Sequence, residues 1–186
     1  MASKITKKNA SHQLIGFLGL LTDLTYVHEV LENSIFEQTI RKLMDEVIVL
    51  LDPVPGVDLT DYKNCLIERF SNPTINDQLT RICTDTSARM PKFLIPSIED
   101  AISEQSSFIF LSFAVACWIK FWTGQSESGA TIPLNDPLKD IINKTACLAQ
   151  DDPKKFLELS KLFSNTIKTN EPFYNLSLIH ISEPTR

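Results

Sequence analysis

Glycine is scarce in this chain, since only 5 of its 186 residues are Gly. Few glycines disfavour turn-rich all-β folds and the glycine loops that cradle phosphate groups. The sequence also contains no G-x-S-x-G, H-E-x-x-H or P-loop pattern, and no G-x-G-x-x-G turn. It therefore lacks the usual signatures of serine hydrolases, zinc peptidases and nucleotide-binding turns.

Closely spaced cysteines and long apolar runs are missing as well. The four cysteines lie 18, 34 and 30 residues apart, so no C-x-x-C pair supports a zinc site. We interpret them as reduced, mostly buried thiols, which suits a cytoplasmic protein. The longest apolar run, 108–122, has 15 residues, whereas a bilayer span needs roughly 20. The basic start of the chain lacks a signal-peptide cleavage site after its apolar stretch. We therefore expect no membrane span.

An excess of basic residues is also absent. The chain has 18 Lys and Arg against 23 Asp and Glu, a net charge of −5. This balance argues against nucleic acid as a partner, because phosphate binding needs a basic surface. Hydrophobic residues make up 43% and charged residues 22%, proportions that exclude a disordered chain. The length suits one domain with its own core.

The last eleven residues have an unusual origin in our interpretation. They read LSLIHISEPTR over 176–186, and one codon choice back-translates them into a run typical of a transposase-type sequencing adapter. We treat them as an adapter-derived tail and discount His180 as a ligand. A natural amphipathic tail is the alternative. We expect natural sequence to be missing beyond residue 175, and also upstream of Met1.

The hydrophobic periodicity is helical, and no stretch alternates convincingly with the period of two that marks a strand. Ser34 with Glu37 forms a possible capping box, and Asp58 or Thr60 can cap a later helix. The segment 107–123 is hydrophobic on nearly every side, which is typical of a central helix. We expect an all-α fold with a loop over 125–137 and helices over 13–30, 34–51, 60–70, 75–83, 97–104, 107–123, 138–149 and 153–164.

Two further expectations concern particular residues. The helix over 34–51 should turn Ile35, with Ile40 and Leu43, towards the interior. The segment 85–88 should interrupt the helical pattern before Pro91. Both follow from local pattern alone.

The first candidate site consists of Lys4, Asn9 and His12, which form a K-x4-N-x2-H pattern. In a helix these residues project at roughly 0°, 140° and 80°, on one side of the rod. An amine, an amide and an imidazole that converge on one cleft can share a hydroxyl or carbonyl substrate. A lysine carries protons when desolvation or neighbouring cations lower its pKa towards neutrality. The alternative is a solvated lysine-rich end without function.

Arginines provide the second group of candidates. Arg81 and Arg89 lie eight residues apart across a turn-like break. Two neighbouring guanidiniums can grip a polyhydroxylated or carboxylated ligand with their planar donor forks. Solvated surface arginines are the alternative, and for Arg69 an exposed salt bridge is the simplest explanation. Asp58 and Asp61 are explained by the helix dipole.

Four fragments, taken in order, resemble one family: Lys4–His12, Asp58–Tyr62, Arg69–Pro73 and Arg81–Pro91. It is the polyol-specific long-chain dehydrogenase/reductase family, which includes mannitol 2-dehydrogenases, D-arabinitol dehydrogenases, fructuronate reductases and tagaturonate reductases. The resemblance covers nearly the whole chain up to residue 175. It implies that residues 1–175 are the helical C-terminal domain of such an enzyme, similar to that of 6-phosphogluconate dehydrogenase. The N-terminal Rossmann domain is then missing.

The resemblance also implies roles for the candidate residues. Lys4 is the general acid/base that moves the alcohol proton, and Asn9 helps to stabilise the developing oxyanion. His12 hydrogen-bonds a substrate hydroxyl, and Arg81 binds substrate. Arg89 stands where many members have lysine, and a guanidinium there favours a carboxylated sugar such as fructuronate. No metal is implied, because lysine takes the part that zinc plays in other alcohol dehydrogenases.

The function implied by the resemblance is a nicotinamide-dependent oxidoreductase. It interconverts a sugar alcohol or hexonate with its keto sugar, of the mannitol/fructose, arabinitol or mannonate/fructuronate type. NAD or NADP binds mostly in the missing Rossmann domain, which packs on this one, so we expect the chain alone to be inactive. Two alternatives stay open. One is a non-catalytic helical interaction module that keeps the scaffold, and the other is an unrelated helical regulator.

Overall fold

The chain is helical throughout its described part. The computed structural model describes residues 10–53, 55–149, 152, 154–159 and 162–182. Within them, β-type pairing is limited to two isolated bridges, so the all-α prediction is confirmed. The elements are α2 (Ala10–Leu21), α3 (Val27–Glu32), α4 (Ser34–Val49), α5 (Leu59–Phe70), the 3-10 turn η2 (Pro73–Ile75), α6 (Leu79–Ile82), α7 (Thr86–Phe93), α8 (Ile95–Ser103), α9 (Ile109–Phe121), α10 (Lys139–Leu148), α11 (Lys154–Leu157), α12 (Asn165–Lys168) and α13 (Glu171–Ser182).

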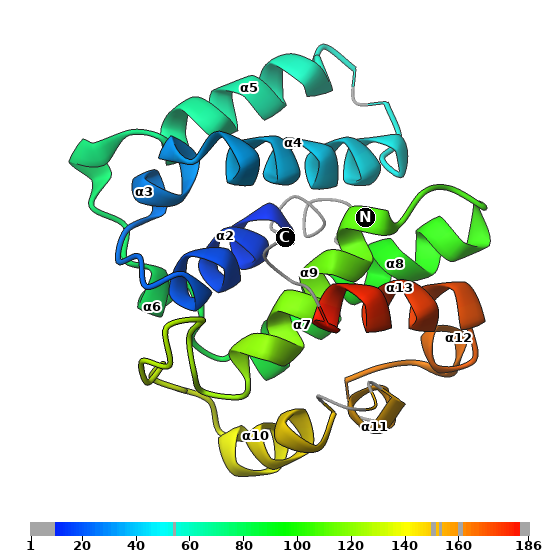
Figure 1. The fold of residues 1–186 in the computed structure, drawn as a ribbon. Helices are drawn as coiled ribbons and strands as arrows, with labels where there is room; N and C mark the ends of the chain where they lie inside the picture. Colours follow the sequence, from blue (N-terminus) through cyan, green and yellow to red (C-terminus); the bar gives the residue numbers. More distant parts are fainter. Residues whose placement is uncertain (1–9, 54, 150–151, 153, 160–161, 183–186) are drawn as a thin grey trace.

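Two apolar helices, α2 and α9, pack against each other in the middle of the molecule (Figure 1). The rings of Phe17 and Phe121 meet there with their centroids 5.3 Å apart. Helix α9 buries most of its residues on all sides, which confirms the predicted central helix. Every residue of α2 except His12 is buried. His12 therefore marks the place where this central helix comes closest to the surface.

The remaining helices surround this pair. Figure 1 shows α4 and α5 side by side above α2, and α10 and α11 at the opposite end of the molecule. Helix α13 packs along α9, where the rings of Phe108 and Phe173 lie 6.2 Å apart. The helix runs on over residues 176–182, so it includes the first part of the segment that we interpret as a tail.

The prediction of one helix over 13–30 is wrong, because α2 ends at Leu21 and α3 begins at Val27. The hydroxyl of Thr22 donates a hydrogen bond to the carbonyl of Leu18 at 2.8 Å. Asp23 then adopts a left-handed backbone with φ of 61°. A side chain that bonds the preceding turn and a left-handed residue together end a helix, whatever the hydrophobic pattern beyond them.

The start of α4 also differs from the prediction. Asn33, not Ser34, is the cap, and its Oδ1 accepts a hydrogen bond from the backbone N–H of Ile35 at 3.0 Å. Glu37 forms no capping box and pairs with Arg41 instead, at 2.8 Å. Ile35 is 71% exposed, so its assignment to the interior was wrong. A cap one residue earlier places Ile35 in the first turn, before the helix reaches the core.

The cap of α5 was predicted correctly, whereas the helix expected over 153–164 was not. Asp58 caps α5, its Oδ1 accepting two backbone hydrogen bonds from the first turn. The helix expected over 153–164 is not continuous in the described residues, which contain the short α11 and then α12. Phe156 and Phe163 pack their rings on Trp118, at 5.4 and 5.9 Å between centroids. Aromatic packing against α9 thus outweighs local helix propensity here.

The interruption predicted over 85–88 lies earlier than expected, between the end of α6 at Ile82 and the start of α7 at Thr86, with Asp85 in a left-handed conformation. Asp136 stabilises this start from the long loop before α10. Its carboxylate accepts hydrogen bonds from the backbone N–H of Ser87 at 2.8 Å and from the Ser87 hydroxyl at 2.7 Å. A carboxylate at a helix N-terminus satisfies free N–H groups and favours the helix dipole.

Two glycines let α6 approach α2 closely. A Cβ atom at Gly16 would lie 2.6 Å from the sulfur of Cys83, and one at Gly19 would lie 2.3 Å from a methyl of Leu79. Any side chain at these positions would push α6 outward. Because Arg81 lies on α6 and His12 lies one turn before Gly16 on α2, this close packing draws the two candidate residues to the same region.

Candidate functional site

A polar hollow of about 460 Å³ opens where α2, α6 and α7 meet. It takes two residues from the first turn of α2, two from α6, the residue before α7 and four from α7. The lining residues are His12, Gln13, Arg81, Ile82, Asp85, Ala88, Arg89, Lys92 and Phe93. Three of them are cations, Arg81, Arg89 and Lys92, which we call the hollow cations. The volume falls within the range of about 300–1,000 Å³ that is typical of small-molecule sites.

His12 is neutral at physiological pH. Its pKa is lowered to about 4, mainly by burial and in addition by the positive charges of Arg69, Arg81 and Arg89, against the opposing effect of Asp77. A neutral imidazole donates a hydrogen bond from one ring nitrogen and accepts one at the other. His12 is therefore suited to bind a hydroxyl group, which also both donates and accepts.

The orientation of the His12 ring is set by the end of α5. The ring packs on Phe70, with centroids 4.4 Å apart and planes tilted by 55°. Phe70 is buried and is the last residue of α5. The fragment Arg69–Pro73 thus contributes to the site through packing beneath the imidazole.

Arg81 is held at the mouth of the hollow by Asp77. The carboxylate of Asp77 accepts hydrogen bonds from Nε at 2.8 Å and from Nη2 at 2.6 and 2.7 Å. The Arg81 side chain is 67% exposed, so the pair adds little to stability. Its effect is geometric, because the hydrogen bonds from both Nε and Nη2 to the Asp77 carboxylate hold the guanidinium in one orientation. The pairing satisfies one side of the guanidinium and leaves donors for a ligand.

Arg89 is less exposed than Arg81. It is half-buried, and its Nη1 donates to the carbonyl of Ile82 at 3.0 Å, at the C-terminal end of α6. A cation there interacts favourably with the carbonyls that end the helix. This bond ties α7 to α6, while the guanidinium keeps donors that the bond does not use.

The position of α7 depends on two buried tryptophans. The indole N–H groups of Trp118 and Trp122 both donate to the hydroxyl of Thr86, at 3.0 and 3.1 Å. All three side chains are buried. The first residue of α7 is therefore fixed to the central helix α9, and Arg89 follows one turn later on that rigid base.

The structure brings three of the five predicted site residues, His12, Arg81 and Arg89, to one hollow. The other two, Lys4 and Asn9, lie outside the described residues. Sequence reasoning missed three others. Asp77 precedes Arg81 by four residues, the spacing of a helical ion pair, and that spacing was a usable signal. Gln13 and Lys92 gave no local signal.

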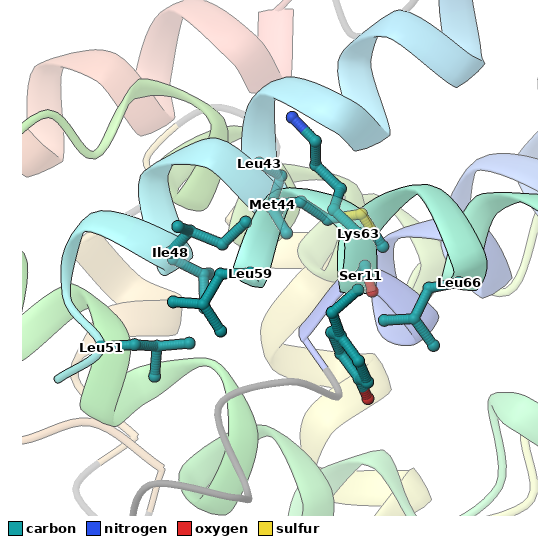
Figure 2. A pocket seen from close by; sticks show the side chains of 10 residues that line it. Ser11, Leu43, Met44, Ile48, Leu51, Leu59, Lys63 and Leu66 are labelled. Atoms are coloured by element: carbon teal, nitrogen blue, oxygen red, sulfur yellow. The ribbon is translucent and has the colours of Figure 1, made fainter. Parts of the chain in front are cut away.

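A second, apolar groove of about 30 Å³ lies between α4 and α5 and reaches the first turn of α2 (Figure 2). Its lining is mostly aliphatic: Leu43, Met44, Val47, Ile48, Leu51, Leu59 and Leu66, with Tyr62, Lys63 and Ser11. The ammonium of Lys63 is paired with Asp45 at 2.5 Å. We call this feature the apolar groove.

Two other kinds of feature are absent from the described residues. They contain no group of three or more His, Cys, Asp or Glu side chains placed to hold a metal ion. None of their helices is long and apolar enough to cross a bilayer.

Comparison with known proteins identifies relatives along nearly the whole chain. The family described as "Mannitol dehydrogenase C-terminal domain" matches residues 1–177. Mannitol 2-dehydrogenase of Aspergillus fumigatus is 39% identical over 171 residues, which are 91% of this chain and 34% of the relative. The enzyme of the same name from Pyricularia oryzae is also 39% identical over 171 residues, with the same two shares. The chain thus spans about a third of the length of these relatives.

Solved structures agree with this fold. Pseudomonas fluorescens mannitol 2-dehydrogenase, in a ternary complex with NAD and D-mannitol, superimposes with a TM-score of 0.89 at 32% identity. The match covers 96% of this chain and 37% of that one. A substrate-free D-sorbitol dehydrogenase shares the fold, with a TM-score of 0.84 at 24% identity over 96% of this chain and 37% of that one. Together these matches show that the chain belongs to the mannitol dehydrogenase C-terminal domain family.

Proposed function

We propose that this chain is the substrate-binding and catalytic domain of a nicotinamide-dependent polyol dehydrogenase. The observation that carries the proposal is the convergence of His12, Arg81 and Arg89 on one hollow of suitable size. A neutral imidazole and two guanidiniums offer directed hydrogen bonds to several oxygens of a polyol or keto sugar. The apolar groove offers no such set.

In this proposal each residue has a distinct part. His12 and Arg81 bind and orient substrate hydroxyls, and Arg89 binds a further substrate oxygen. Lys4 accepts the proton of the reacting alcohol, and Asn9 stabilises the developing oxyanion. Support for the last two is their sequence spacing from His12, with Asn9 directly preceding α2. The reaction then needs no metal for proton transfer.

The cofactor belongs to another part of the longer protein. The residues described here are helical and offer no βαβ unit with a glycine-rich turn for a dinucleotide. We propose that NAD or NADP binds to a Rossmann domain packed on this one. When bound there, its nicotinamide accepts the hydride, while the residues of this chain orient the substrate and move its proton.

The substrate pair that we favour is mannitol and fructose, because the relatives from Aspergillus fumigatus and Pseudomonas fluorescens are named for mannitol. Arabinitol is a second neutral candidate with the same hydrogen-bonding groups. A carboxylated sugar such as mannonate or fructuronate is the third, favoured by the hollow cations. The setting we propose is the cytoplasm. All four cysteines are free; Cys83 and Cys117 are buried as predicted, whereas Cys65 and Cys147 are exposed, which the sequence interpretation had not expected. Unpaired thiols suit a reducing compartment.

The test is a hybrid enzyme. The chain is joined to the N-terminal part of Aspergillus fumigatus mannitol 2-dehydrogenase, and NAD-dependent oxidation of mannitol, arabinitol and mannonate is measured. We expect activity, and Lys4→Ala should lower turnover by about 10²–10⁴, the loss for removing a general acid/base. The unfused chain is the negative control, and we expect it neither to bind NADH nor to turn over.

The contrary outcome is also clear. A hybrid that folds and binds NADH but oxidises none of the three substrates would support a non-catalytic interaction module. Near-normal turnover of the Lys4→Ala hybrid would remove Lys4 from the role of acid/base.

A further inference from the structure

We infer that Gln13 is a specificity residue that accepts a hydrogen bond from a neutral hydroxyl of the polyol. The inference rests on the proposed function. Gln13 lies in the first turn of α2, next to His12, and lines the polar hollow. Its side-chain amide thereby extends the set of candidate substrate contacts beyond those that sequence reasoning found.

The first observation is an unsatisfied polar atom. Gln13 is only 2% exposed, and its Oε1 has no hydrogen-bond partner. An unpaired acceptor in the interior lowers stability, because folding removes its water without replacing the bond. Because the side chain lines the hollow, rotation about its last torsion can bring this oxygen to a ligand hydroxyl that completes the bond.

The second observation is the balance of donors and acceptors around the hollow. The hollow cations only donate hydrogen bonds, and each hydroxyl of a polyol carries a hydrogen that needs an acceptor. The side-chain acceptors among the lining residues are His12, Gln13 and Asp85. Asp85 is exposed, so Gln13 is the buried acceptor, placed beside the imidazole.

The amide also suits the chemical class of the ligand. Rotation about its last torsion presents either the oxygen or the nitrogen to the hollow. A hydroxyl can pair with both, whereas a carboxylate can pair only with the nitrogen and is repelled by the oxygen. Gln13 therefore favours a neutral hydroxyl at its position, and with it a polyol over a hexonate.

The test uses the hybrid enzyme and Gln13→Met, which keeps the length of the side chain and removes the amide. We expect KM for mannitol to rise about tenfold, the effect of losing one neutral hydrogen bond, with kcat nearly unchanged. The melting temperature should rise, because the unpaired carbonyl is gone. A structural residue that is unrelated to substrate would not combine higher stability with weaker binding.

Ser97→Ala is the matched control. Ser97 is fully buried on α8, its hydroxyl also lacks a partner, and it does not line the polar hollow. This variant should raise the melting temperature and leave KM unchanged. Monodeoxy mannitols sharpen the assignment. The analogue that lacks the contacted hydroxyl should bind more weakly than mannitol in the parent hybrid but equally well in Gln13→Met.

Results that contradict the role of Gln13 can be distinguished from results that contradict the proposed function. An active parent hybrid whose KM is unchanged by Gln13→Met, or by Gln13→Leu if the first variant does not fold, overturns this inference alone. If the parent hybrid is inactive, the proposed function fails. The role of Gln13 is then tested by the shift in melting temperature that mannitol causes. Equal shifts in the parent and in Gln13→Met overturn the role of Gln13, whereas a shift in the parent alone supports it.

Discussion

The polar hollow and the apolar groove meet the same helical turn and differ in every other respect. Ser11 lines the groove, whereas His12 and Gln13 line the hollow. The groove measures about 30 Å³ and is aliphatic, while the hollow measures about 460 Å³ and contains three cations. The groove is a packing seam between α4 and α5, and the hollow is the candidate ligand site.

This contrast shows that one buried helix contributes both to a packing groove and to the candidate ligand site. One side of the first turn of α2 packs in the apolar groove, and the adjacent side lines the candidate site. Substitutions in the groove should therefore change the free energy of unfolding without changing KM. Substitutions in the hollow should change KM, whatever their effect on stability.

The largest expected effect is in the groove. Leu43→Ala removes a fully buried side chain of α4 and should lower the free energy of unfolding by about 2–5 kcal/mol. Urea denaturation of the chain measures this change. Ile35→Ala is the control, because Ile35 is on the same helix and 71% exposed, and its effect should stay within about 0.5 kcal/mol. A raised KM for mannitol in the Leu43→Ala hybrid would contradict the idea that the groove contributes to stability and not to substrate binding.

A pH titration tests the hollow. The pKa of His12 is lowered from 6.5 to about 4, mainly by burial, so the unfolded chain binds a proton at this residue before the folded chain does. Stability should therefore fall as the pH drops from about 6.5 to about 4, by up to about 3 kcal/mol. Urea denaturation across this range, for the chain and for His12→Asn, isolates the effect as the difference between the two curves. Parallel curves would show that His12 is exposed to solvent.

The smallest effect on stability is expected at Asp77. Asp77→Asn weakens the grip on the exposed Arg81 and should change the free energy of unfolding by less than about 1 kcal/mol. KM for mannitol should nevertheless rise several-fold in the hybrid, because the guanidinium is no longer held in one orientation. Glu37→Gln is the matched control, since it breaks a similar pair with Arg41 on α4, at 2.8 Å. Equal KM values for the two variants would contradict a positioning role for Asp77.

Local signals predicted much of the fold. The central position of α9 followed from its uniformly apolar composition, and the start of α5 followed from Asp58. The break between α2 and α3 was missed, because apolar residues continue beyond it while Asp23 turns left-handed. The start of α7 was missed because the carboxylate that stabilises it belongs to Asp136, 49 residues after Ser87.

The candidate site divides in the same way. Residue type and spacing selected His12, Arg81 and Arg89, and the structure places all three at one hollow. Gln13 was passed over, because nothing local distinguishes a buried glutamine from one on the surface. Its burial results from the packing of neighbouring helices around α2, and its unpaired oxygen is visible only once those neighbours are in place.

By itself, the amino-acid sequence determined the helical class, the family and the types of side chain available for chemistry. Helical periodicity and motif spacing are written within short stretches of chain, so they can be read without a structure. Only the tertiary structure decided that α6 lies against α2, that His12 is kept neutral and that Gln13 lacks a partner. Those properties depend on contacts between residues far apart in the chain and on the exclusion of water, neither of which a local pattern contains.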